Sequence, residues 1–272
     1  MLSTADLDRI AESIHTGPYE GYPALDQRLY ATSPGFSADG ETVVIPDGPW
    51  HVHHHVNRHG VAPQLMDPEV PEERPAAADE LARGWRAEGL SLDQHGRPLH
   101  PFWRQLLADP RIGMPTGAGF FYRYGPNATV DPVVYRFDTA GQVEFLLIKR
   151  LHGGRWALPG GFRDRTDASA EATARREAAE ETGLDAIGGT AETVLHAVPV
   201  NPRETLHAWA ENTVVLIHGH QEYLHDAQPV PGDDAIDVGW FTMPRIGDLD
   251  LLHGHAAYID TIARGLSAPG RP

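Results

Sequence analysis

The sequence predicts an α/β (α+β) fold in which a mixed β-sheet is sandwiched between helices. Two observations lead to this fold class. Short runs rich in β-branched and aromatic residues recur in the second half of the 272-residue chain. Stretches with helical start and stop signals separate these runs. Strands that alternate with hairpins and helices favour a mixed sheet with helices on both faces.

The strands are predicted from four apolar runs. Residues 133–137 and 143–149 are separated by the turn-forming stretch 138–141, so we expect them to form a hairpin. Residues 213–217 and 237–241 have the same β-branched and aromatic character and predict further strands.

Three stretches predict helices. Residues 168–182 give the strongest signal, because Asp167 or Ser169 can cap the start and Gly183 can end the helix. Residues 76–87 predict a helix that Gly89 ends, and residues 256–264 predict the last helix.

Composition divides the chain into three parts. Residues 1–115 are rich in Pro, Gly, His and Trp and have weak periodicity, so we expect an N-terminal flanking or capping region. Residues 116–266 carry the strong strand and helix signals and predict the main domain. Residues 267–272 predict a disordered tail.

Charge and residue usage exclude several classes of function. The net charge is −16 and no basic block stands out, which argues against nucleic-acid binding. The chain has no cysteine, which excludes disulfides and thiolate metal sites and fits a reducing compartment. It also lacks an apolar signal core and a long apolar run. We therefore expect a cytoplasmic protein without nucleic-acid or membrane partners, and the sequence does not predict its oligomeric state.

Three carboxylates share one face of the strongest predicted helix. Glu177, Glu180 and Glu181 fall at positions i, i+3 and i+4. Like charges at this spacing cost stability unless a cation lies between them. Carboxylate oxygens suit Mg²⁺ or Mn²⁺. The alternative is a solvated acidic face that pairs with Arg175 and Arg176.

A glycine turn precedes this helix. Gly160 and Gly161 follow a short apolar stretch and permit backbone geometry that other residues avoid. A carbonyl in this turn can complete a metal shell. The turn and the acidic helix together indicate metal-assisted chemistry on a phosphate-containing substrate.

Residues 161–184 resemble the Nudix box, G-x5-E-x7-R-E-U-x-E-E-x-G-U. Residues 176–184 match its second half, apart from Ala178 at the U position. The first half departs from the pattern, because the loop is one residue longer and Asp167 stands in for the first glutamate. In the family, this glutamate mainly supports the loop–helix–loop structure.

Further segments resemble the mitochondrial-type ADP-ribose pyrophosphatases within this family. Residues 123–127 with Asp131-Pro132 are similar to that group's R-W-G-P-N and D-P motifs. Residues 201–205, 231–235 and 254–255 are similar to its D-P-R-N-T, A-G-D-D-A and S-H motifs. The same segments are similar to the ADP-ribose-binding domain of a channel of the transient receptor potential M subfamily.

The resemblance implies Mg²⁺-dependent (or Mn²⁺-dependent) hydrolysis of the diphosphate bond of ADP-ribose to AMP and ribose 5-phosphate. It implies a catalytic and metal-binding role for Glu177, Glu180 and Glu181, with the Gly160 carbonyl as a further metal ligand. The implied substrate-binding residues are Asn127, Arg203, Asp233 and His255. The candidates for the general base, among which the sequence does not choose, are Glu204, Glu211, Asp233 and Asp234.

Three alternatives stay open. The chain can be a module that senses ADP-ribose without cleaving it, although retained clustered carboxylates argue against a pure sensor. It can also be a Nudix pyrophosphatase for another substrate, such as NADH, a dinucleoside polyphosphate or an oxidised nucleotide. The His-rich run at residues 51–55 can form a transition-metal site on a strand, but a polar loop is the interpretation we favour.

Overall fold

The computed structural model describes residues 1–14, 35–36, 43–44, 78–112, 121, 123–151, 153–199, 204–233, 235–252 and 254–266. The chain divides into two compact units, Met1–Asn127 with Val200–Ala210, and Ala128–Pro199 with Glu211–Pro272. The predicted boundary near residue 115 and the predicted tail at 267–272 lie outside the described residues, so both stay predictions.

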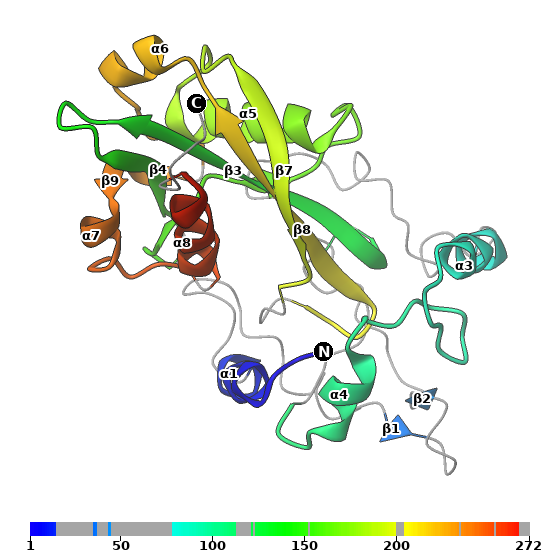
Figure 1. The fold of residues 1–272 in the computed structure, drawn as a ribbon. Coiled ribbons are helices and arrows are strands. Elements are labelled where there is room, and N and C mark those ends of the chain that lie inside the picture. The colour runs from blue at the N-terminus through cyan, green and yellow to red at the C-terminus, as the bar shows by residue number, and fades with distance from the viewer. Residues whose placement is uncertain are drawn as a thin grey trace. The chain divides into compact units, whose positions relative to one another are not determined.

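The first unit contains helices and a small sheet. Ser3 and Asp6 cap the start of α1, since each backbone N–H donates to the other's side chain. The unit's apolar core gathers Ile10, Trp103, Leu106 and Leu206. Its elements are α1 (Thr4–Ile14), β1 (Gly35–Phe36), β2 (Val43–Val44), α3 (Ala78–Ala87) and α4 (Trp103–Ala108), as Figure 1 shows.

The second unit is built on most of a seven-stranded sheet. The main path runs β5, β4, β3, β8, β7, while β6 pairs with β3 and β9 pairs with β4. The predicted hairpin is confirmed, because β3 and β4 pair antiparallel across the 138–141 turn. The strands are β3 (Gly125–Phe137), β4 (Val143–Arg150), β5 (Trp156–Ala157), β6 (Gly161–Phe162), β7 (Thr190–Ala197), β8 (Ala208–His218) and β9 (Ala235–Thr242).

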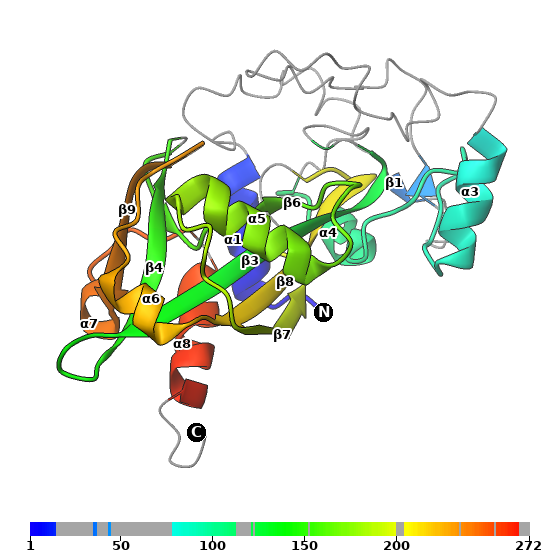
Figure 2. The same ribbon diagram turned by 90° about the horizontal axis from the view of Figure 1, so that it is seen from above.

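Helices cover both faces of this sheet, which confirms the predicted architecture. The helices of the unit are α5 (Ala170–Thr182), α6 (Gln221–Asp226), α7 (Met243–Ile246) and α8 (His255–Leu266). Neighbouring residues of β3 point to opposite faces: Val134 joins the core cluster that contains Ala178 of α5, and Val133 joins the cluster that contains Ile259 of α8. Figure 2 shows α5 lying along the strands. No helix of the described residues is both long and apolar enough to cross a membrane.

Local signals fix the ends of α5, the helix that carries the acidic face. The Ser169 hydroxyl accepts a hydrogen bond from the Ala172 N–H at 3.1 Å, so Ser169 is the N-cap. Gly183 ends the helix in the left-handed conformation with φ 67°, and its N–H bonds to the Ala179 carbonyl. Both predicted signals are therefore confirmed, and Ser169 rather than Asp167 is the cap.

Candidate active site

Helix α5 and the turn before it form the candidate site. Glu177 and Glu181 are buried, at 7% and 3% exposure, whereas the Glu180 side chain is 46% exposed. Buried carboxylates are rare unless they are paired or bind a cation. The three predicted ligands therefore combine two shielded groups with one that solvent reaches.

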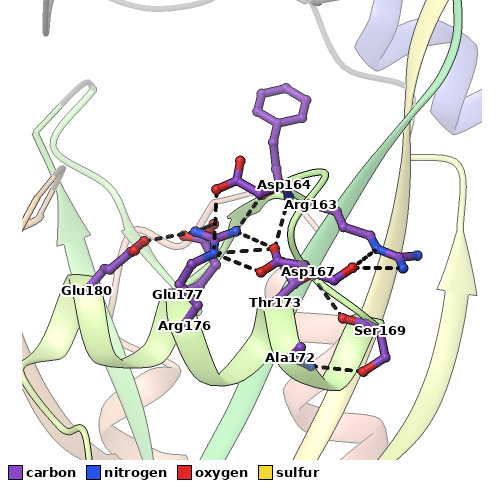
Figure 3. Close-up of polar contacts among 10 residues, drawn as sticks. Arg163, Asp164, Asp167, Ser169, Ala172, Thr173, Arg176, Glu177 and Glu180 are labelled. Carbon is purple, nitrogen blue, oxygen red and sulfur yellow. Dashed lines mark hydrogen bonds and ion pairs between the residues drawn. The ribbon is translucent and has the colours of Figure 1, made fainter. Parts of the chain in front are cut away.

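Arg176 supplies the positive charge among these carboxylates. Its Nη1 donates to Glu177 Oε1 at 2.7 Å and to Glu180 Oε2 at 2.9 Å. Its Nη2 donates to Asp167 Oδ2 and to the Phe162 carbonyl, both at 2.9 Å. Figure 3 shows the guanidinium group among these acidic side chains. The pairing that the sequence offered as an alternative to a metal is thus present for Arg176.

The glycine turn fits closely against the acidic face. The Gly160 N–H donates to Glu181 Oε2 at 2.8 Å. A Cβ added to Gly161 would lie 2.7 Å from both carboxylate oxygens of Glu177. Gly161 therefore leaves the space that the Glu177 carboxylate occupies, and the turn and the helix form one structural unit.

The donor set fits a hard divalent cation. Burial raises the pKa of Glu177 to about 7, although the Arg176 guanidinium acts in the opposite direction. A bound cation stabilises the charged form of such a buried carboxylate, because it replaces the water that the carboxylate lost on burial. In the described part of the chain, no three His, Asp or Glu side chains already converge on one point. Arg176 and the Gly160 N–H hold the carboxylates instead, and Arg176 bonds to one oxygen of Glu177 and one of Glu180.

Asp167 occupies the place that the box assigns to its first glutamate. Its carboxylate pairs with Arg176 at 2.9 Å and accepts the Asp164 N–H at 2.9 Å. The hydrogen bond from Arg176 lowers the pKa of Asp167 to about 2. Asp167 is shorter than glutamate, but it lies on a longer loop and still reaches α5. Arg176 therefore has an acidic partner at this position although the loop differs from the Nudix box.

Replacing Asp167 gives a pH-dependent prediction. We expect Asp167→Asn to lower the free energy of unfolding by about 1–2 kcal/mol near neutral pH. The pKa of Asp167 falls from 3.8 to about 2 on folding, so its stabilisation is complete above the unfolded pKa and disappears as pH falls through the folded one. Urea titrations of both proteins measure the difference, which should shrink to about half near pH 3. A difference that does not change with pH contradicts this role.

The segment before β9 reaches the end of α5. The Val230 N–H donates to the Thr182 carbonyl, and the Gly232 N–H donates to the Glu181 carbonyl. Asp233 follows directly, is exposed, and has φ 44°. Among the described residues it alone has a positive φ without being glycine. Such strain is typical of functional positions, and the structure places Asp233 next to the last turn of the acidic helix.

Two predicted residues lie inside the first unit. Asn127 is buried, and its Nδ2 donates to the carbonyls of Arg123 and Gly125 at 3.0 and 3.1 Å. Glu204, a candidate base, is buried as well and bonds to His100 Nε2 at 3.1 Å and to the Ala210 N–H at 3.3 Å. Both side chains thus have structural contacts within this unit. Glu211, another candidate base, is exposed in the second unit.

His255 is buried at the start of α8. Its Nδ1 accepts the Leu158 N–H at 3.0 Å, and its Nε2 lies 3.8 Å from Asp131 Oδ2. The sequence pointed to Asp131 only through its D-P dipeptide, and it gave no signal for Asn212, which donates to the same carboxylate. Arg203, Asp234 and the run at residues 51–55 lie outside the described residues, so the statements about them stay predictions.

Three named proteins show what this chain is similar to. A putative nudix hydrolase 6 from Caenorhabditis elegans is 32% identical over 174 residues, which cover 61% of this chain and 63% of that protein. The mitochondrial ADP-ribose pyrophosphatase of Rattus norvegicus is 29% identical over 237 residues, 74% of this chain and 64% of that protein. A transient receptor potential cation channel subfamily M member-like 2 from Nematostella vectensis is 26% identical over 202 residues, 65% of this chain and 12% of the channel.

The chain therefore spans less than two thirds of the length of each of these three relatives. A family model described as the NUDIX domain matches residues 127–262, which is half of the chain. The matched range contains the acidic helix, the glycine turn and most of the sheet that carries them. The chain belongs to the Nudix family.

Proposed function

We propose that the protein is a Nudix hydrolase that cleaves the diphosphate bond of ADP-ribose to AMP and ribose 5-phosphate. The observation that carries this proposal is the acidic face of α5, with Glu177 and Glu181 buried against the Gly160–Gly161 turn. The name of the rat relative, ADP-ribose pyrophosphatase, supports the choice of substrate.

The chemistry suits this arrangement of carboxylates. A diphosphate resists attack because its oxygens carry negative charge, and a bound divalent cation offsets that charge. Glu177, Glu180 and Glu181, with the Gly160 carbonyl, would hold Mg²⁺ or Mn²⁺. A water molecule attacks one phosphorus, the P–O bond to the bridging oxygen breaks, and the leaving phosphate keeps the electron pair of that bond.

A carboxylate that accepts the proton of the attacking water completes the reaction. We propose Asp233 for this role among the candidates that the sequence left open. The hydrogen bonds of the Val230–Gly232 segment bring Asp233 to the end of α5, and its side chain is exposed. Glu204 is a poorer candidate, because its carboxylate is buried and bonded to His100.

A substrate panel tests the proposal. The purified chain is incubated with ADP-ribose, NADH, a dinucleoside polyphosphate and an oxidised nucleotide, each with Mg²⁺, with Mn²⁺ and with a chelator, and products are separated by chromatography. We expect the chain to form AMP and ribose 5-phosphate from ADP-ribose when metal is present and to form neither product with the chelator. If another compound is turned over faster than ADP-ribose, the proposed substrate is wrong. If calorimetry shows that ADP-ribose binds but no product forms, the proposed enzymatic activity is wrong and the chain is a sensor of ADP-ribose.

A further inference from the structure

A second polar cluster lies within the same unit, beside the glycine turn. It contains Asp131 of β3, Asn212 of β8 and His255 at the start of α8, all less than 10% exposed. Tyr258 lies next to this cluster: burial raises the pKa of its phenol, and the Asp131 carboxylate adds to the effect. Three different elements thus converge on one carboxylate.

Hydrogen bonds fix the orientation of each member. Asn212 Nδ2 donates to Asp131 Oδ2 at 2.6 Å, while its Oδ1 accepts from the Thr129 hydroxyl at 3.1 Å. His255 Nδ1 accepts the Leu158 N–H, so a neutral ring carries its proton on Nε2. That Nε2–H faces Asp131 Oδ2 at 3.8 Å. The carboxylate therefore orients the Asn212 amide directly and attracts the His255 ring, whose tautomer is set by the Leu158 N–H.

The cluster connects to the acidic helix through the turn at residues 158–160. His255 binds the Leu158 N–H at one end, and Glu181 binds the Gly160 N–H at the other. Pro159 between them has no N–H to donate. Asp131 also packs directly against the turn, because its Oδ1 occupies the space that a Cβ on Gly160 would need. Both backbone donors of the turn are thus held by side chains.

We propose that Asp131 is a positioning residue for the reaction. Through His255 and through its contact with Gly160, it holds the turn that orients the Glu181 carboxylate and the Gly160 carbonyl. Asp131 is not required to touch the substrate. The expected effect on kcat rests on the proposed hydrolysis of ADP-ribose. The expected effect on the glycine turn can be measured without any turnover.

The first test uses the wild-type chain and Asp131→Asn. An amide in place of the carboxylate removes the negative charge that faces the Asn212 amide and the His255 ring. We expect amide hydrogen exchange at Leu158 and Gly160 to become about tenfold faster, and kcat for ADP-ribose to fall about 30-fold with KM changed by less than about threefold. Asp260→Asn is the matched control, because Asp260 is an exposed residue of α8 paired only locally with Arg264.

The outcomes separate this inference from the proposed function. Exchange rates that match those of the control overturn the positioning role, whatever the activity. A large rise in KM instead of a fall in kcat also overturns it, because it indicates a direct substrate contact. If the wild-type chain cleaves no panel compound, the proposed function fails, and faster exchange at Leu158 and Gly160 alone still supports the positioning role.

Two further measurements keep the inference testable if Asp131→Asn does not fold. Nitrogen-15 chemical shifts of the His255 ring in the wild-type chain should show the Nε2–H tautomer, and an Nδ1–H tautomer contradicts the arrangement. Asn212→Ala removes the amide donor to Asp131 and the acceptor of the Thr129 hydroxyl but keeps the Asp131 carboxylate. We therefore expect smaller changes of exchange and kcat in the same direction. Changes confined to residues far from Leu158 and Gly160 contradict the connection.

Discussion

Glu181→Gln is expected to reduce kcat for ADP-ribose about 10³-fold, which corresponds to roughly 4 kcal/mol of transition-state stabilisation. Glu181 is buried, and the Gly160 N–H fixes its carboxylate beside the turn. Glutamine keeps the shape and still accepts this hydrogen bond, but it lacks the charge that a divalent cation needs. Steady-state kinetics at several Mg²⁺ concentrations measure the loss, and excess metal should not restore the rate.

The control for this variant comes from the same helix. Glu171→Gln removes a carboxylate in the first turn of α5, where Glu171 is exposed and pairs with Arg175. We expect its kcat to stay within about twofold of wild type, because Glu171 is not among the proposed metal ligands. Loss of an exposed pair of this kind lowers stability by only about 0.3–0.5 kcal/mol. Turnover by Glu181→Gln that equals turnover by Glu171→Gln shows that our assignment of the metal ligands is wrong.

Arg176→Gln is expected to lower the free energy of unfolding by about 3 kcal/mol in the presence of a chelator. The guanidinium bonds to Asp167, Glu177 and Glu180 and is 24% exposed. Without it, the carboxylates repel one another on one side of α5, and Glu177 remains buried without a cation. Denaturant titrations of the metal-free proteins give the difference.

Arg264→Gln provides the comparison for this prediction. Arg264 pairs with Asp260 at the same i, i+4 spacing, but its side chain is 71% exposed. The loss should therefore stay below about 1 kcal/mol. If both arginine variants lose the same stability, Arg176 is an ordinary surface residue, and the acidic face is stabilised by other contacts.

The parts of the fold that were predicted are those with local signals. The ends of α5 follow from Ser169 and Gly183, and the β3–β4 hairpin follows from a turn between two apolar runs. β7 was missed because most of its side chains are exposed, so no alternation of apolar and polar residues marks it. The four-residue α7 and the six-residue α4 are too short for a helical period to appear.

The candidate site also has a part with local sequence signals and a part without them. The acidic face of α5 could be predicted because its three carboxylates lie within five residues of one another. The contact between Leu158 and His255 joins residues 97 positions apart, and that between Asn212 and Asp131 joins residues 81 apart. Such pairs depend on the tertiary fold, and a single sequence holds no periodicity that connects them. The sequence therefore located the charge of the site but not the residues that hold it in place.

The hydrogen bonds of Arg176 have a consequence for how the chain reaches its folded state. A helix that carries Glu177 and Glu180 beside Asp167 would be hard to form if its charges had to wait for a metal ion. Arg176 lies on the same helix, within four residues of both glutamates, and bonds to all three acidic groups. The segment therefore carries its own counter-ion, which offsets the charge of these three acidic groups without a metal ion.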